Sequence, residues 1–157
     1  MTISADDRVH LRRCVQLAAE ALDDGDEPFG CVLVDAAGQV RFEDRNRVKT
    51  GDKTRHPEFE IARWSVNLTP EERRTSTVYT SGEHCPMCSA AHAMMGLGRI
   101  VYAVSTEQLN RWRHDWGVAP SPVAPLPISA VAPDVPVAGP CDELVVEVQA
   151  LHRRHAG

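Results

Sequence analysis

Two short segments place soft metal ligands where helices are predicted to begin. The first, HPE, starts at His56, and the second, CPMC, runs from Cys85 to Cys88, so that residues 57–84 separate His56 from Cys85. One imidazole and two thiolates are ligands that zinc takes in tetrahedral sites, and three protein ligands leave the fourth position open for water. If His56, Cys85 and Cys88 bind one zinc ion, the chain must fold so that these two helix starts meet.

Glu58 lies two residues after His56, in the first turn of the predicted helix. From there its carboxylate can face a water on the metal without ligating the metal, which is the place of a general acid–base group. Each motif alone has another interpretation. A C-x-x-C pair at a helix start also occurs in thiol redox proteins, and a structural zinc site would need a fourth ligand that neither motif offers.

Length and charge limit the class of protein. A chain of 157 residues has the size of one domain, so we expect residues 1–157 to form a single domain. The net charge of −5 disfavours a dedicated nucleic-acid binder. There is no apolar stretch long enough to cross a membrane, and the charged first residues do not form a secretory signal. Because five cysteines do not suggest a disulfide scaffold, we expect a cytoplasmic protein without a membrane partner.

Hydrophobic periodicity and turn residues predict helices that alternate with strands, which favours one sheet between layers of helices. The expected elements are a helix over Ala5–Asp24; a hairpin of strands over Pro28–Asp35 and Gln39–Asn46; a helix from Pro57 to before Pro70 with core residues Phe59, Ile61, Ala62 and Val66; strands over Ser76–Ser81 and Arg99–Ser105; and helices over Cys85–Gly96 and Thr106–Trp116, the last capped by Thr106. The proline-rich residues 118–140 are expected to lie extended, as an edge strand, before a C-terminal helix over residues 141–156.

Longer segments around these motifs carry a family resemblance. PFGCVLV starts at Pro28, HPEFEIA at His56 and TSGEHCPMCSAA at Thr80. In these segments the chain resembles the cytidine-deaminase superfamily, and most of all its bacterial guanine deaminase and nucleoside deaminase branch. The resemblance implies a three-layer α/β/α fold with a five-stranded mixed sheet, a homodimer, and zinc-dependent hydrolytic deamination. The implied substrate is a free nucleobase or related aminated heterocycle: guanine first, with amino-pyrimidines and amino-triazines as further candidates.

The resemblance also implies a role for each site residue. His56, Cys85 and Cys88 would bind Zn²⁺, and Glu58 would move protons between water, ring and leaving ammonia. Asn46 would bind an exocyclic oxygen or a ring nitrogen of the base. A stacking face would come from Phe29 or the His56 ring. The branch uses a second carboxylate from the C-terminal part of the chain, for which we expect Glu143, with Asp115 and Glu107 as alternatives.

Two residues depart from the family pattern. Pro57 stands where the branch has alanine or glycine, and it has no backbone N–H to donate to a base. This departure leaves room for rings smaller than guanine. His84 stands where the family has proline, and it is either a substitute ligand, a donor at the pocket edge or a tolerated replacement; we favour the last.

Three functional hypotheses therefore remain. The first is deamination of a free base. The second keeps the chemistry and acts on adenosine in transfer RNA, or on cytosine or a nucleoside. For RNA, a basic face would be expected, because RNA binding rests on phosphate contacts. The third is a C-x-x-C redox or structural-zinc protein without deaminase activity.

Overall fold

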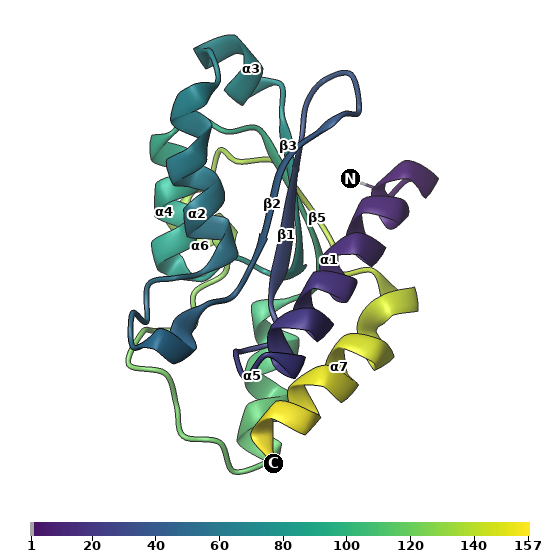
Figure 1. Ribbon diagram of the computed structural model, residues 1–157, viewed down its shortest axis with the longest axis vertical. Helices are drawn as coiled ribbons and strands as arrows, with labels where there is room; N and C mark the ends of the chain where they lie inside the picture. Colours follow the sequence, from purple (N-terminus) through teal and green to yellow (C-terminus); the bar gives the residue numbers. More distant parts are fainter. Residues whose placement is uncertain (1) are drawn as a thin grey trace.

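A mixed sheet of five strands forms the centre of the computed structural model, which describes residues 2–157 (Figure 1). The strand order is β2-β1-β3-β4-β5. β1 is antiparallel to β2 and β3, whereas β3, β4 and β5 are parallel to one another. The prediction of a five-stranded mixed sheet is confirmed. The strands are β1 (Gly30–Val34), β2 (Val40–Arg45), β3 (Thr77–Gly82), β4 (Arg99–Val104) and β5 (Val137–Ala138).

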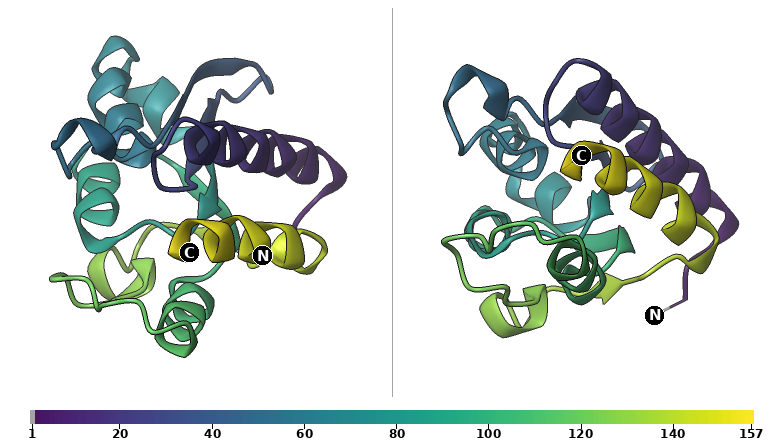
Figure 2. Two further views of the ribbon diagram at one scale, coloured as in Figure 1. Left: turned by 60° about the horizontal axis from the view of Figure 1, so that its bottom comes forward. Right: turned by 90° about the horizontal axis from the view of Figure 1, so that it is seen from below.

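Helices cover both faces of this sheet. Figure 1 shows α2, α3, α4 and α6 on one side, and Figure 2 shows α1 and α7 side by side across the other, with α5 beside them. No helix within residues 2–157 has the length and apolar character needed to cross a membrane. The helices are α1 (Ala5–Asp23), α2 (Pro57–Trp64), α3 (Pro70–Arg74), α4 (Pro86–Met94), α5 (Thr106–Asp115), α6 (Ile128–Val131) and α7 (Asp142–Ala156), with short 3-10 turns at Val48–Thr50 and Ser65–Asn67.

β1 is buried along its whole length because helices pack on both of its faces. Its residues alternate between two cores, so that Val32 and Val34 meet α1 and α7, while Cys31 and Leu33 meet α2. Gly30 begins the strand where α1 passes closest, and a Cβ there would collide with the carbonyl oxygen of Cys14. The sheet and its two helical layers are thereby held in close contact at the end where the ligand-bearing segments lie.

Several local predictions are corrected. Val66 is 70% exposed instead of buried, because α2 ends at Trp64 and the following 3-10 turn points that side chain outward. The cap of α5 is Ser105, whose side chain accepts from the Gln108 amide, and not Thr106. The short helix α3 was not expected, although its Thr69 cap box is a helix-start signal. The proline-rich segment contains the short helix α6 before β5 reaches the sheet edge.

A buried charge network ties the start of α1 to the sheet. Asp7, only 3% exposed, accepts from Arg99 at 2.7 Å and from the Tyr79 hydroxyl at 2.7 Å, and also from the Ser4 amide. Burial opposes ionisation of Asp7, but these hydrogen bonds outweigh it and lower the pKa of Asp7 to about 2. The ionised carboxylate is therefore the form that stabilises the fold.

Replacing Asp7 with asparagine should lower the free energy of unfolding at pH 7 by about 2 kcal/mol, because the carboxyl pKa falls on folding from 3.8 to about 2. This contribution is fully present above pH ~4 and is lost as the pH falls through ~2. The difference in free energy of unfolding between wild type and Asp7→Asn, measured by urea unfolding, should thus fall to roughly half by pH 3. Asp6→Asn, at an exposed neighbouring position, is the control; a gap that does not change with pH would contradict the assignment.

Candidate active site

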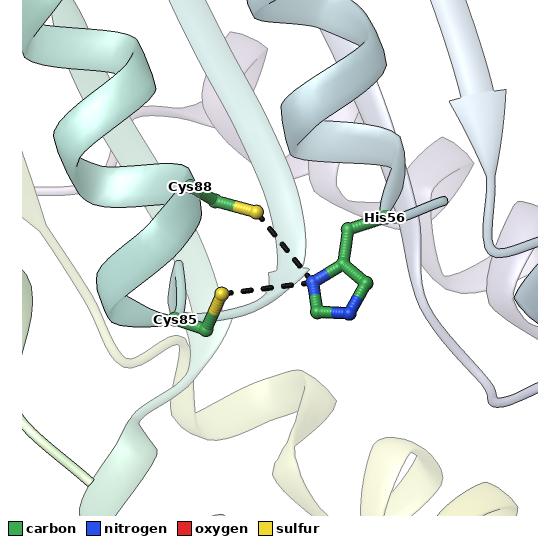
Figure 3. Close-up of side chains that lie close together, drawn as sticks. All are labelled: His56, Cys85 and Cys88. Atoms are coloured by element: carbon green, nitrogen blue, oxygen red, sulfur yellow. Dashed lines mark hydrogen bonds between the residues drawn. The ribbon is translucent and has the colours of Figure 1, made fainter. Parts of the chain in front are cut away.

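Three ligand atoms converge at the adjoining ends of α2 and α4, as Figure 3 shows. His56 Nδ1 lies 3.6 Å from Cys85 Sγ and 3.6 Å from Cys88 Sγ, and all three atoms lie within 4.8 Å of one another. A tetrahedral zinc with ordinary Zn–N and Zn–S bonds spaces such atoms by about 3.5 Å. The three side chains therefore fit a zinc ion, and they are the metal site that the sequence predicts.

The local sequence explains why these side chains point at one another. His56 is the N-cap of α2 and Cys85 is the N-cap of α4, and each is followed by proline at the first helical position. Proline is favoured there because it fixes a helical φ and its missing N–H has no partner in the first turn. Cys88 lies one turn into α4, on the same side as Cys85. Both helix N-termini also favour thiolate charge.

The three ligand side chains shift one another's pKa values. Hydrogen bonding from Cys88 and then from His56 lowers the pKa of Cys85 to about 4, against the effect of burial. Hydrogen bonding to Cys85 raises the pKa of His56 to about 9. The pKa of Cys88 is raised, first because of its hydrogen bond to Cys85 and then because of burial. Cys85 is thus a thiolate at neutral pH, and a thiolate is the form of cysteine that binds a metal.

Glu58 lies beside the ligands and is only 6% exposed. Its Oε2 is 3.9 Å from Cys88 Sγ, and its Oε1 is 3.0 Å from the Thr80 hydroxyl at the end of β3. Burial raises the pKa of Glu58. A buried carboxyl with a raised pKa, held at the edge of a metal site, is suited to accept and return a proton. Sequence reasoning did not identify Thr80, although it opens the TSGEHCPMC segment.

Asn46 is buried at 1% exposure just after β2. Its Oδ1 accepts from the amides of Glu27 at 3.3 Å and Val48 at 3.2 Å, which fixes the orientation of the side chain. Its Nδ2 has no hydrogen-bond partner in residues 2–157. A buried amide donor without a partner is costly, and a ligand acceptor would satisfy it. The backbone carbonyl of Phe29 accepts from the Asn46 amide, so Phe29 and Asn46 are neighbours.

The structure does not bring the expected second carboxylate to this cluster. Glu143, in the first turn of α7, pairs with Arg8 at 3.0 Å and Arg12 at 3.6 Å on α1, and its catalytic role stays a prediction. The alternatives are also engaged elsewhere, because Glu107 pairs with Arg111 and Asp115 lies against His114.

His84 is buried and is not one of the ligands. Its ring meets the ring of His92 edge-on at 5.5 Å, below α4. His92 is itself fixed, with Nε2 2.7 Å from the Gly98 carbonyl oxygen. The interpretation of His84 as a substitute ligand is therefore not supported, and the residue packs beneath the turn that the family makes with proline.

The purified protein should contain about one zinc per chain, because three ligands are already arranged for it. Cys85→Ser should lose most of this metal, since a hydroxyl does not replace the thiolate. Cys141→Ala, at a buried thiol in the α1–α7 core, should retain it. Elemental analysis of the three proteins is the measurement. Wild-type protein without zinc, with Cys85 and Cys88 joined in a disulfide, would instead indicate a redox protein.

Comparisons with known proteins agree with this geometry. A family model described as the cytidine and deoxycytidylate deaminase zinc-binding region matches residues 4–104. The chain is 36% identical over 121 residues to a protein of Schizosaccharomyces pombe named probable cytosine deaminase, a match that spans 75% of this chain and 72% of the relative. It is 28% identical over 108 residues to tRNA-specific adenosine deaminase 2 of Xenopus tropicalis, spanning 64% of this chain and 63% of that one.

Solved structures with the same fold include two guanine deaminases. The enzyme of Bacillus subtilis aligns with a TM-score of 0.58 and 27% identity, over 76% of this chain and 82% of that chain. The enzyme of Nitrosomonas europaea aligns with a TM-score of 0.70 over 99% of this chain and 86% of that chain; its 17% identity shows the fold alone. The family match covers His56, Glu58, Cys85 and Cys88. The chain belongs to the cytidine and deoxycytidylate deaminase family, the hydrolytic deaminases with a zinc-binding region.

Proposed function

We propose that this enzyme deaminates a free nucleobase or a related small aminated heterocycle, releasing ammonia. The observation that carries the chemistry is the buried Glu58 carboxyl, 3.9 Å from a metal-ligand sulfur and held by Thr80. The observation that carries the substrate class is the buried, unpartnered amide donor of Asn46. Together they provide a proton carrier and a fixed donor for a planar, acceptor-bearing ring.

Zinc held by His56, Cys85 and Cys88 would lower the pKa of a bound water toward about 7. Glu58 accepts the proton of the attacking water and delivers it to the ring nitrogen next to the amino-bearing carbon. The new C–O bond forms as this nitrogen is protonated. Glu58 then takes the proton of the newly added hydroxyl and passes it to the amino group, so that a C=O bond forms as the C–N bond breaks and ammonia is released. The raised pKa of Glu58 keeps both its charged and neutral forms accessible during this cycle.

The rest of the pocket supports a ring of base size. The half-buried ring of His56 offers a stacking face, and Phe29 lies next to Asn46. Pro57 occupies the first turn of α2 without an N–H, which weakens the case for guanine as the sole substrate. Amino-pyrimidines therefore compete with guanine in this proposal, in line with the cytosine deaminase name of the S. pombe relative.

Deamination of adenosine in transfer RNA is the second candidate, because several relatives are named for it. The net charge of −5 argues against it, since RNA recognition rests on cationic contacts to phosphates. The redox alternative is weaker still, because the family is one of hydrolytic deaminases.

We also propose that the enzyme works as a homodimer in a reducing compartment such as the cytoplasm. Val66 and Met94, in the α2–α4 layer, are 70% and 85% exposed, and burying apolar side chains of this kind would stabilise a contact with a second copy. All five cysteines are free thiols, as a reducing compartment would keep them.

Glu58→Gln should retain zinc but lose turnover by ~10²–10⁴-fold, because glutamine keeps the size of the side chain and removes the proton acceptor. Glu60→Gln is the matched control: it lies on the same helix and pairs with Arg55 instead of facing the metal ligands. Ammonia release and metal content should be measured on the same preparations. Near-normal turnover by Glu58→Gln would show that another group moves the proton.

A panel of cytosine, guanine, an amino-triazine, their nucleosides where these exist, and a transfer-RNA anticodon stem-loop tests the substrate class. Free bases should have the highest kcat/KM, with amino-pyrimidine or amino-triazine and guanine within about tenfold of one another. Ammonia release is the common readout. The stem-loop as the best substrate would favour the transfer-RNA hypothesis, and no ammonia from any compound would contradict the proposed function.

A further inference from the structure

Two oppositely charged side chains near the candidate active site have no charged partner. Within the described part of the chain, no ion pair and no side-chain hydrogen bond engages the Glu27 carboxylate or the Arg113 guanidinium. Arg113 extends from α5 and is half-buried, and Glu27 precedes β1 and is also half-buried. Most other arginines near carboxylates on this protein are paired, for example Arg45 with Asp24 and Asp26.

Each of the two residues contacts a residue of the expected substrate pocket, Glu27 contacting Asn46 and Arg113 contacting Phe29. The Glu27 amide donates to Asn46 Oδ1, which fixes Glu27 next to the residue with the free donor. Burial lowers the pKa of Arg113, and Glu27 acts in the opposite direction. Glu27 is therefore held next to Asn46, and its charge acts on Arg113.

Phe29 forms the surface under Arg113. The guanidinium carbon lies 5.9 Å from the centre of the Phe29 ring, and His152 of α7 meets the same ring edge-on at 5.0 Å. A Cβ on Gly82 would come within 3.0 Å of that ring, so the ring lies against the end of β3, which leads to Cys85. Phe29 thus connects Arg113 to the strand that positions the metal ligands.

Leaving a partly buried guanidinium and a partly buried carboxylate unpaired is costly, because each has lost part of its hydration without a compensating ion pair. A cation–π contact with Phe29 offsets a part of that cost for Arg113 and none for Glu27. A ligand with an acceptor and a donor side by side would satisfy both groups. Planar rings with an oxo group next to a ring N–H have this pair of atoms.

We infer that Arg113 and Glu27 determine specificity, with Arg113 donating to a ring oxo group of the substrate and Glu27 accepting from the adjacent ring N–H. The inference rests on the proposed function and adds the substrate class to it: aminated rings with a lactam edge. Asn46 Nδ2 then donates to an acceptor of the ring other than the nitrogen that Glu58 protonates, and the amino-bearing carbon faces Glu58 and the metal ligands.

Pairs of substrates with and without the oxo group test how much the lactam edge contributes to kcat/KM. Cytosine and 4-aminopyrimidine differ by the oxo group, as do guanine and 2-aminopurine. Wild type should prefer the oxo-bearing member of each pair. Arg113→Met should lower kcat/KM for that member by roughly 10-fold to 150-fold, mostly through KM, because a hydrogen bond to a charged group is lost. Turnover of the members without the oxo group should change little.

Arg111→Met is the control, because Arg111 lies on the same helix, is exposed and pairs with Glu107. It should behave as wild type. Arg113→Lys should regain part of the preference, since it keeps the charge without the planar fork of donors. Zinc content should be equal in all variants, which shows that the metal site is intact.

The outcomes separate the two proposals. If wild type turns over these rings but Arg113→Met keeps the preference for the oxo group, Arg113 only covers Phe29 and the inference is wrong. An equal fold-loss of kcat/KM for both members of each pair also contradicts the inference, because such a loss indicates a general disruption of the active site. If wild type releases ammonia from none of the four rings, the inference fails; if it also releases none from the amino-triazine, the proposed function fails as well.

Discussion

The meeting of two helix N-termini beside the end of β3 is the constraint on which the site depends. A histidine and a cysteine can cap neighbouring helices in many folds, but here one nitrogen must come within 3.6 Å of two sulfurs. The parallel pairing of β3 with β4 requires a crossover connection, and α4 is the helix in it. That helix begins immediately after the turn that follows β3. α2 packs on α4, so its own first residue arrives at the same place.

Burial at this place decides the chemistry of Glu58. In water a glutamate is ionised at neutral pH and is a weak base. Beside β3 the same carboxyl has lost its hydration, which raises its pKa, and its two oxygens face Thr80 and Cys88. A cation among His56, Cys85 and Cys88 would act in the opposite direction and favour the carboxylate. The proposed role of Glu58, to hold a proton and release it within one cycle, depends on the balance of these two effects.

The metal ligands and Glu58 could be predicted from the sequence because their spacing follows from local structure: caps, first turns and prolines at helix starts. The central strand of the sheet was predictable for a similar reason, since β1 is a continuous apolar segment between turn residues. The sequence was less informative wherever tertiary contacts determine the partners or the exposure of a side chain. Glu143 opens a helix, as expected, but the arginines of α1 lie across from it and pair with its carboxylate. The exposure of Val66 depends on a 3-10 turn that no local pattern marked. Arg113 and Glu27 have no sequence signal, because an absent partner is visible only in the folded chain.

The residues of the metal site and the residues that we infer to select the substrate lie in different parts of the chain. The family match ends at residue 104, and it contains every metal ligand together with Glu58 and Asn46. α5 and α7, which supply Arg113 and His152 to the surface around Phe29, lie beyond it. Relatives that share the matched region are named for cytosine and for adenosine in transfer RNA. A common metal site with differently named substrates requires that part of the selection come from residues outside the ligand set. In this chain, α5 and α7 place Arg113 and His152 against Phe29. If Arg113 selects the ring as we infer, changes in these helices would alter the accepted ring without disturbing the zinc ligands.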